Sequence, residues 1–311
     1  MRCFRREGAE NVKKIKYRVN QLSIPANILC HALFILICIT CLYPILLTIG
    51  ISFSDERSLF DYGYAMIPKV ISLEAYSFIL NSGGGIGRAY INTIFVTVCG
   101  TVLSILLLSL YAYPLSRKEF SGKKFFTFFA FFTMLFSGGL VPWYIVCTQI
   151  LHIHNTYFAL ILPMVFSAWN MLILRTFFSS AIPTAVIESA KIDGAGEYRS
   201  FFKIVLPLSK AGLATIGLFS TLAYWNDWYH SMMLITNDNL NSLQFYLQRI
   251  FLNIQVLKSG LLESSAAAAM DLPSEAARMA MCVLVMGPIV FVYPFFQKYF
   301  ISGLTIGAVK G

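Results

Sequence analysis

Two long stretches of the sequence carry no charged side chain. Asp, Glu, Lys and Arg are absent from the 36 residues between Val19 and Ser54 and from the 50 residues between Phe125 and Leu174. A helix crosses the hydrocarbon core of a bilayer with about 20 apolar residues, so the first stretch allows one crossing and the second allows two. Charged residues make up only 13% of the chain, against about a quarter in soluble domains. These features exclude a soluble enzyme and indicate a protein that spans the membrane several times.

The hydropathy pattern predicts an all-α membrane protein with six transmembrane helices. The expected spans lie near residues 28–51, 91–114, 125–147, 156–177, 209–234 and 277–297. We expect Gly138, Gly139 and Pro142 to bend the third span, and Ser274 to begin the helix of the sixth. Residues 239–258 repeat apolar side chains at helical spacing, which predicts an outer amphipathic helix.

Lysine and arginine residues are distributed unevenly between the two sides that six spans create. Of the 24 such residues, 18 fall on the side of the N-terminus. Because positively charged loops remain in the cytoplasm, both termini are predicted to be cytoplasmic. We expect a basic cytoplasmic tail over residues 1–20, an uncleaved first span and a transmembrane domain over residues 21–311. This topology accounts for the net charge of +9 without a nucleic-acid partner.

Other motif-like patterns are interpreted as structural. The glycines within residues 81–88 lack the Gly-Lys-Ser/Thr of a phosphate-binding loop, so we expect a flexible connector there. His152 and His154 are two residues apart and do not share a helix face, which argues against a metal site. The seven cysteines lie mostly within predicted spans and are expected to pack as small apolar residues.

A charged segment separates the fourth and fifth predicted spans. Pro183 suits the first turn of a helix, and Asp193-Gly194 ends that helix because glycine accepts the left-handed conformation. Gly196 and Glu197 begin a second helix. Its apolar face carries Phe201, Phe202 and Val205. We therefore predict a cytoplasmic helix–turn–helix with small residues at its corner. A hairpin that lies at the lipid headgroups is the alternative that periodicity leaves open.

This segment resembles the EAA loop of bacterial ABC importer permeases. The family pattern is Glu-Ala-Ala, three residues, Gly, nine residues and Ile-x-Leu-Pro, and this chain has Glu188-Ser189-Ala190, Gly194 and Ile204-Val205-Leu206-Pro207. The spacing matches throughout, and Ser189 is the sole departure. Asp193 and Ala195 match a variant that is common in the carbohydrate-uptake branch. Further stretches resemble the maltose/multiple-sugar type of permease and its complex-saccharide subgroup: 112–117, 136–144, 225–228 and 298–311.

The resemblance implies the type I ABC importer permease fold and a transport subunit rather than an enzyme. It implies a second homologous permease, a cytoplasmic ABC ATPase dimer, an extracytoplasmic solute-binding protein and an oligosaccharide substrate, in a bacterial cell membrane. ATP and Mg would bind to the ATPase partner, because this chain has no G-x-x-x-x-G-K-[ST] motif, and no cofactor is expected here.

The resemblance also assigns roles to particular residues. The coupling loop over residues 181–207 would dock into the ATPase, and the tail over residues 298–311 would extend into the cytoplasm, with Gly303 to Gly311 near the ATPase dimer interface. The residues implied in ATPase coupling are Glu188, Ser189, Ala190, Asp193, Gly194, Ala195, Ile204, Leu206 and Pro207.

Polar side chains inside spans are candidates for the substrate pathway, because burying them in lipid is costly. Asp227 is the only carboxylate within a predicted span, and Trp225, Asn226 and Trp228 flank it. Aromatic rings and hydrogen-bonding groups of this kind hold sugars, and Asn170 is a second candidate. A polar knot between Asp227 and His230 explains the same residues equally well.

Other functional classes remain as alternatives. The chain could be an ABC permease for another small polar solute, an ion-coupled secondary transporter, or a membrane enzyme that uses Asp227 and His230. An ion-coupled transporter gives no reason for the EAA spacing. An enzyme would bring several polar residues together at one depth, and the predicted spans lack a second carboxylate.

Overall fold

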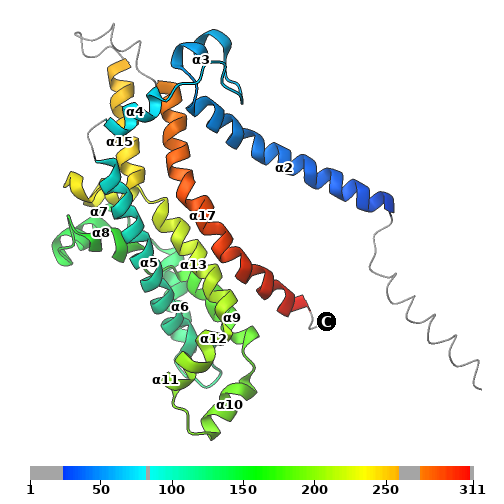
Figure 1. The fold of residues 1–311 in the computed structure, drawn as a ribbon. Coiled ribbons are helices and arrows are strands. Elements are labelled where there is room, and N and C mark those ends of the chain that lie inside the picture. The colour runs from blue at the N-terminus through cyan, green and yellow to red at the C-terminus, as the bar shows by residue number, and fades with distance from the viewer. Residues whose placement is uncertain (1–23, 82–84, 259–273, 309–311) are drawn as a thin grey trace, which may run out of the picture.

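The computed structural model describes residues 24–81, 85–258 and 274–308, and these are mostly helical (Figure 1). Three helices are the longest: α2 (Ile24–Ser52), α5 (Ile86–Ser116) and α17 (Ser274–Ala308). Each contains a segment long and apolar enough to cross a membrane. The first, second and sixth predicted spans are thereby confirmed, as is the helix start at Ser274. Among the described residues, β pairing is limited to one isolated bridge between Ser54 and Ile71.

The three remaining predicted spans, 125–147, 156–177 and 209–234, fall in three bent pairs of helices, of which the last begins before the predicted span, at Glu197. Each consists of two helical segments that together are apolar enough to cross, joined at a bend: Lys123–Leu135 with Leu140–Ile150 (114°), Tyr157–Met164 with Ala168–Ala181 (53°), and Glu197–Leu208 with Lys210–Trp225 (80°). If each bent pair counts as one crossing, the described chain reaches the six crossings that hydropathy predicts. The named elements are α6 (Lys123–Leu135), α7 (Leu140–Ile145), η1 (Val146–Ile150), α8 (Tyr157–Ile161), η2 (Leu162–Met164), α9 (Ala168–Ala181) and α13 (Lys210–Trp225).

The third span bends where the sequence predicts a bend, but far more sharply than a kink. α6 ends at Leu135, and Gly139 has φ 87°, a conformation that side chains other than glycine rarely adopt. The chain therefore leaves the axis of α6 before Pro142 is reached. The predicted bend in the third span is thereby confirmed, and its angle is 114°.

The fifth span is also shorter than predicted. α13 ends at Trp225, and a separate helix, α14 (Tyr229–Leu234), follows. Asp227 lies in the break, where its carboxylate accepts a hydrogen bond from the backbone N–H of His230 (3.3 Å). Its carbonyl oxygen accepts one from the hydroxyl of Ser242 (3.0 Å). These bonds satisfy polar groups that a continuous helix would use itself, so Asp227 is not inside a membrane-spanning helix as the sequence suggested.

The two ends of the bundle carry different connections (Figure 1). We call one the loop end; it consists of α3 (Glu56–Tyr62), α4 (Glu74–Asn81), η4 (Asp238–Leu240) and α15 (Leu243–Lys258). We call the other the hairpin end; it consists of α10 (Thr184–Ile192), α11 (Glu197–Ser200), η3 (Phe201–Val205) and α12 (Leu206–Leu208). α15 is the predicted amphipathic helix, and Leu243, Leu247, Ile250 and Ile254 on one of its faces are buried. Residues 1–20 and residues 82–84 of the predicted glycine-rich connector lie outside the described residues, and the last part of that connector, 86–88, belongs to α5.

Glu56 joins the loop end to the sixth span. It is buried on α3, and its carboxylate accepts hydrogen bonds from the backbone N–H groups of Glu275 (3.1 Å) and Ala276 (3.1 Å). Those N–H groups lie in the first turn of α17 and have no partner within the helix. A carboxylate at the positive end of the helix dipole is favourable, so Glu56 caps a helix that lies more than 200 residues later in the sequence.

Small and hydroxyl-bearing residues bring α5 and α13 together. Gly100 of α5 lies against the ring of Tyr224 on α13, and Thr101 is hydrogen-bonded to Thr221 at 3.2 Å. The hydroxyl of Tyr224 also donates to the carbonyl oxygen of Ile161 at 2.9 Å, which joins α8 to the contact between α5 and α13. Close approach through small side chains and interhelical hydrogen bonds is the usual way in which membrane helices associate.

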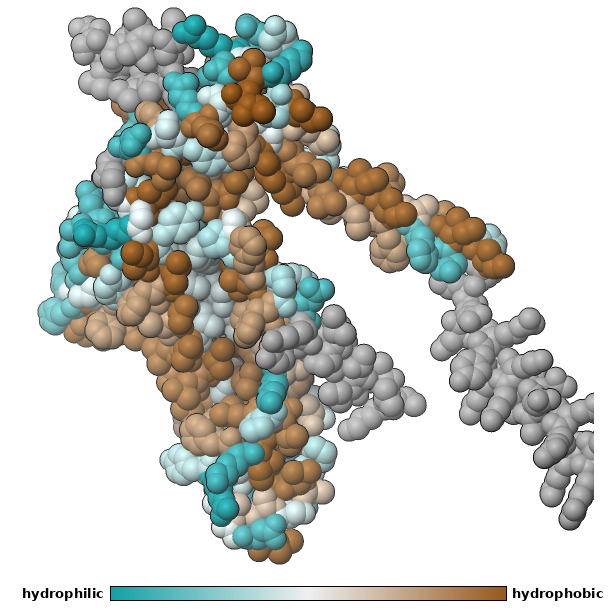
Figure 2. All heavy atoms as spheres, in the orientation of Figure 1, coloured by the Kyte–Doolittle hydropathy of each residue, from teal (hydrophilic) through white to brown (hydrophobic). Residues whose placement is uncertain are grey.

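α2 differs from the other spans because it has few neighbours within the chain. No residue of α2 before Gly50 is buried, and the helix projects from the bundle as an almost uniformly apolar rod (Figures 1 and 2). Only its last turns pack against α17, where Ile51 joins a cluster with Ala277 and Ala280. The apolar surface of α2 is therefore available to lipid or to another membrane protein.

Gly100→Ala is expected to destabilise the bundle. An added Cβ would lie 2.5 Å from the anchored ring of Tyr224, and overpacking of this kind costs about 1–3 kcal/mol. The measurement is thermal unfolding of the purified protein in detergent. Gly87→Ala on the same helix is the matched control, because a Cβ there meets no atom within 4 Å and alanine is the better helix former. Equal melting temperatures for the two variants would contradict the packing argument.

Candidate functional site

The charged segment folds as a helical hairpin whose turn is a Schellman motif. Gly194 has φ 78°, and its N–H donates to the carbonyl oxygen of Lys191 at 3.0 Å. The N–H of Ala195 donates to the carbonyl oxygen of Ala190 at 2.8 Å. These are the two bonds that close a helix around a left-handed glycine. The predicted helix–turn–helix, with its break at Asp193-Gly194, is confirmed.

The first helix of the hairpin has one buried side and one exposed side. Ile187 and Ala190 are buried, and Ile187 packs with Phe178 and Phe201 in the core cluster of the hairpin end. The exposed residues at the tip of the hairpin include the predicted Glu188, Ser189 and Asp193. Among the described residues, none forms a hydrogen bond or ion pair with the carboxylate of Glu188.

Two large apolar side chains accompany these polar groups. Ile192 is 86% exposed and Tyr198 is 80% exposed, at the end of α10 and in α11. Sequence reasoning did not select either residue, because an apolar residue in a helix is usually assigned to the core. Their position on either side of the glycine turn was the available indication. Their exposure makes the tip a mixed apolar and acidic surface.

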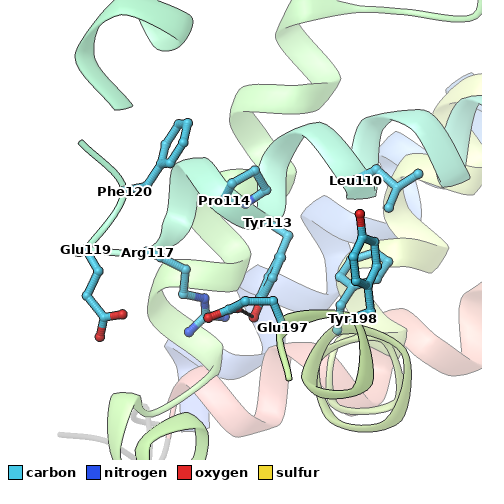
Figure 3. A pocket seen from close by; sticks show the side chains of 9 residues that line it. Leu110, Tyr113, Pro114, Arg117, Glu119, Phe120, Glu197 and Tyr198 are labelled. Atoms are coloured by element: carbon cyan, nitrogen blue, oxygen red, sulfur yellow. Dashed lines mark hydrogen bonds between the residues drawn. The ribbon is translucent and has the colours of Figure 1, made fainter. Parts of the chain in front are cut away.

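A polar network ties the hairpin to the end of α5 (Figure 3). The hydroxyl of Tyr113 donates to Glu197 at 2.8 Å, and Lys191 forms ion pairs with Glu197 (3.0 Å) and with Glu119 (2.6 Å). The hydrogen bond to Glu119, followed by the one to Glu197, raises the pKa of Lys191, so its ammonium group stays charged over the physiological range. Exposed ion pairs contribute little to stability, so this network serves chiefly to set geometry.

The hairpin is joined to α13 by an irregular segment. A π-helix, η3, follows α11, and the chain then turns by 80° at Ser209. The predicted residues Ile204 and Leu206 pack against the core cluster of this end, while Pro207 is exposed at the bend. These three residues therefore lie in the junction between hairpin and span, not at the exposed tip. Their position in the junction depends on side-chain packing and could not be predicted from the spacing of the motif.

The candidate substrate residues around Asp227 do not form one site. Trp225 is buried, and its indole N–H donates to the carbonyl oxygen of Val285 at 3.1 Å, which packs α13 against α17. Asp227 pairs with the ring of His230 at 2.9 Å, with both side chains largely shielded from solvent. This is the polar knot that sequence analysis left open as an alternative. In this structure, Trp225 and Asp227 are engaged within the protein.

Trp228 is the accessible aromatic residue of this group. It is 40% exposed and lines a pocket of about 570 Å³ between α15 and α17. Gln244, Gln248 and Arg278 line the same pocket, and Gln244 is hydrogen-bonded to Asn226 at 3.4 Å. Sequence reasoning did not select these three polar residues, although Arg278 is a charged residue inside the sixth predicted span.

Asn170 lies apart from this pocket. It belongs to the first turn of α9, where its backbone N–H donates to the hydroxyl of Ser167 at 3.3 Å, and it is not among the residues that line the pocket. The structure therefore brings Asn226 and Trp228 near one pocket and leaves Asn170 elsewhere.

Comparison with known proteins identifies the family. Residues 105–306 match the model of the binding-protein-dependent transport system inner membrane component. This match covers more than half of the chain. The chain belongs to this family. The permease is thus a multi-pass protein of the bacterial inner membrane and a transport subunit, as its resemblance to the EAA-loop proteins implied.

Individual relatives extend the match to almost the whole permease. It is 37% identical to the polygalacturonan/rhamnogalacturonan transport system permease protein YtcP of Bacillus subtilis, over 92% of this chain and 98% of that protein. It is 27% identical to the arabinooligosaccharides transport system permease protein AraQ of Halalkalibacterium halodurans, over 89% and 94% of the two chains. A chain in the crystal structure of a bacterial ABC transporter that imports the acidic polysaccharide alginate matches with a TM-score of 0.73, 28% identity and coverage of 91% and 100%. The type I ABC permease fold is confirmed.

Membership of the family fixes the general composition of the assembly. A binding-protein-dependent ABC importer contains a partner permease, an ATPase that is a separate subunit and a solute-binding protein. The permease itself is not an enzyme.

Gly194→Ala is expected to loosen the hairpin. An L residue in the left-handed conformation costs about 1–2 kcal/mol, so the Schellman hydrogen bonds should open more often. Hydrogen–deuterium exchange of the peptide covering residues 184–200 would measure this as faster exchange. Ser189→Ala, which places an alanine on the exposed side of α10, is the control and should exchange like the wild type. Unchanged exchange in Gly194→Ala would show that the turn does not depend on glycine.

Proposed function

We propose that this permease forms half of the translocation pathway of an ATP-driven importer of oligosaccharides or complex-carbohydrate fragments. The relatives support a carbohydrate substrate: their names specify polygalacturonan/rhamnogalacturonan, arabinooligosaccharides and alginate. These substrates differ in sugar and charge but share the chemistry of a polyhydroxylated chain. The alternative of another small polar solute is less well supported, because several distinct relatives transport saccharides.

The observation that carries the coupling role is the exposed tip of the hairpin. The carboxylate of Glu188, with which no described residue pairs, lies on the same surface as exposed Ile192 and Tyr198. Apolar side chains bordered by charge fit a protein partner, whereas the anionic inner leaflet of a membrane repels the carboxylates of Glu188 and Asp193. We therefore assign the hairpin end to the cytoplasm and the tip to a contact with the ATPase. ATP and Mg bind to the ATPase subunits, and this chain needs no cofactor of its own.

Some residues of the motif contact the ATPase, and others hold the hairpin in the conformation that makes this contact. Glu188, Ser189 and Asp193 meet the ATPase directly, while Ala190, Gly194 and Ala195 hold the turn that presents them. Ile204, Leu206 and Pro207 connect the hairpin to α13, and the bond between Glu197 and Tyr113 connects it to α5. Closure of the ATPase dimer then moves the hairpin as one body and shifts α5 and α13 with it.

Two other exposed surfaces, α2 and the loop end, suit the second permease and the solute-binding protein. The unburied apolar length of α2 suits packing against the second, homologous permease as well as lipid. The loop end, on the outer side by this topology, suits docking of the solute-binding protein.

Glu188→Lys is expected to release the ATPase. Reversal of an interfacial charge places like charges or an unpaired cation in the contact, which should lower the amount of ATPase that co-purifies with the tagged permease by about tenfold or more. Glu74→Lys, an equivalent reversal on an exposed residue of α4 at the loop end, is the control and should retain the ATPase. Wild-type amounts of bound ATPase and normal transport in Glu188→Lys would contradict the coupling role.

Uptake by the reconstituted importer tests the substrate class. Proteoliposomes that contain the permease, its partner and the ATPase should accumulate labelled oligosaccharides only when ATP and the binding protein are supplied. Dissipation of ion gradients with an ionophore should leave the rate unchanged, because ATP supplies the energy. Uptake that follows an ion gradient would favour a secondary transporter, and ATP-driven uptake of amino acids but not saccharides would contradict the proposed substrate.

A further inference from the structure

The pocket between α15 and α17 combines an apolar wall with several polar side chains. Its volume of about 570 Å³ lies within the range of roughly 300–1,000 Å³ that small-molecule sites occupy. One side is apolar, formed by residues such as Leu247, Met281 and Val285. The polar groups come from Gln244, Gln248 and Arg278, and an indole ring comes from Trp228.

Arg278 has hydrogen-bonding capacity that the protein does not use. Its Nε is buried, and none of the described residues accepts its proton. Nη2 lies 3.5 Å from Glu275, and the guanidinium plane lies over the ring of Phe251 at 4.7 Å. Glu275 and Phe251 therefore orient the guanidinium. The buried Nε–H is closed to a ligand, but the side chain is 43% exposed, so its terminal nitrogens can be reached. A guanidinium held in this way offers the geometry that binds a planar carboxylate.

The surrounding polar groups suit a saccharide rather than lipid. Glutamine and arginine side chains facing hydrocarbon are costly, so these residues are expected to face protein or water. Within the described part of the chain, the amide of Gln248 has no hydrogen-bonding partner, and it is only partly buried. Amide groups bind sugar hydroxyls, and the half-exposed ring of Trp228 provides a flat surface for stacking against a pyranose ring.

We infer that this pocket is a subsite for an acidic sugar unit of the transported oligosaccharide, with Arg278 binding the uronate carboxylate. Arg278 is the only charged residue among those that line the pocket in the described structure. Glu275, which is not part of the lining, contacts only Nη2, so the exposed part of the guanidinium presents a positive charge that favours a negative group. Trp228 stacks on the ring of the sugar, and Gln244 and Gln248 bind its hydroxyls. This inference rests on the proposed function, because it assigns a site and a charge to the saccharide that the importer carries.

The test compares two substrates that differ in the charge of the carboxyl group and in the methyl group that neutralises it. Uptake of labelled oligogalacturonides and of their methyl esters is measured in proteoliposomes that contain the complete importer. For Arg278→Gln, uptake of the acidic form should fall by about tenfold or more, because a charge-assisted hydrogen bond is lost, while uptake of the ester should stay within about twofold of wild type. Arg278→Lys should restore part of the uptake of the acidic form, because lysine keeps the positive charge but lacks the planar guanidinium that binds a carboxylate with two hydrogen bonds. Trp228→Ala should lower uptake of both forms, because stacking does not depend on charge.

Several outcomes would overturn this inference, and they separate it from the proposed function. If Arg278→Gln lowered uptake of both forms equally, the role of Arg278 would be structural. If uptake of neither form fell, Arg278 would not be part of the binding site. Import of neutral oligosaccharides but not of the acidic form by the wild type would overturn the subsite alone. Import of neither by the wild type would overturn both proposals. Lys124→Gln, which removes one positive charge from an exposed residue of α6, controls for net charge and should transport both forms like the wild type.

Discussion

The ring of Tyr224 on α13 lies against Gly100 on α5, and this contact joins the two ends of the permease. Its hydroxyl also reaches the carbonyl oxygen of Ile161 and thereby connects α8, α5 and α13. α5 runs from this contact to Tyr113, which binds the hairpin through Glu197. α13 runs the other way to the break after Trp225, beside the pocket that Trp228 lines. Because Gly100 has no side chain, α5 and α13 pack closely. We therefore expect a displacement of one helix to be transmitted to the other.

The breaks in the spans are as important as the spans themselves. Within hydrocarbon, each unpaired backbone group is expensive, so a helix can break only where other protein groups replace its hydrogen bonds. At the end of α13, the carbonyl oxygen of Asp227 accepts a bond from Ser242, and its carboxylate caps α14. At Ser209, the turn follows a π-helix and places the hairpin nearly across the axis of α13. The first break lies beside the pocket between α15 and α17, and the second joins α13 to the hairpin whose tip we assign to the ATPase contact.

Much of this arrangement was predictable from local sequence. The start of α10 after Pro183 and its end at Gly194 follow from the dihedral preferences of proline and glycine, and both were found where expected. The course of α15 follows from periodicity in the same way. The end of α13 was not predictable, because residues 209–234 are apolar enough for a longer helix. Its termination depends on Ser242 and Val285, which are distant in the sequence.

By itself, the sequence determined that this protein spans the membrane several times and that a charged hairpin lies between the fourth and fifth predicted spans. Both properties arise from neighbouring residues, through the length of apolar runs and the conformational limits of proline and glycine. Tertiary structure alone decided which polar residues are available for binding. It buried Trp225 against Val285, paired Asp227 with His230, and left Trp228 and Arg278 facing one pocket. Whether a side chain is free depends on partners from other helices, and no local pattern contains that information.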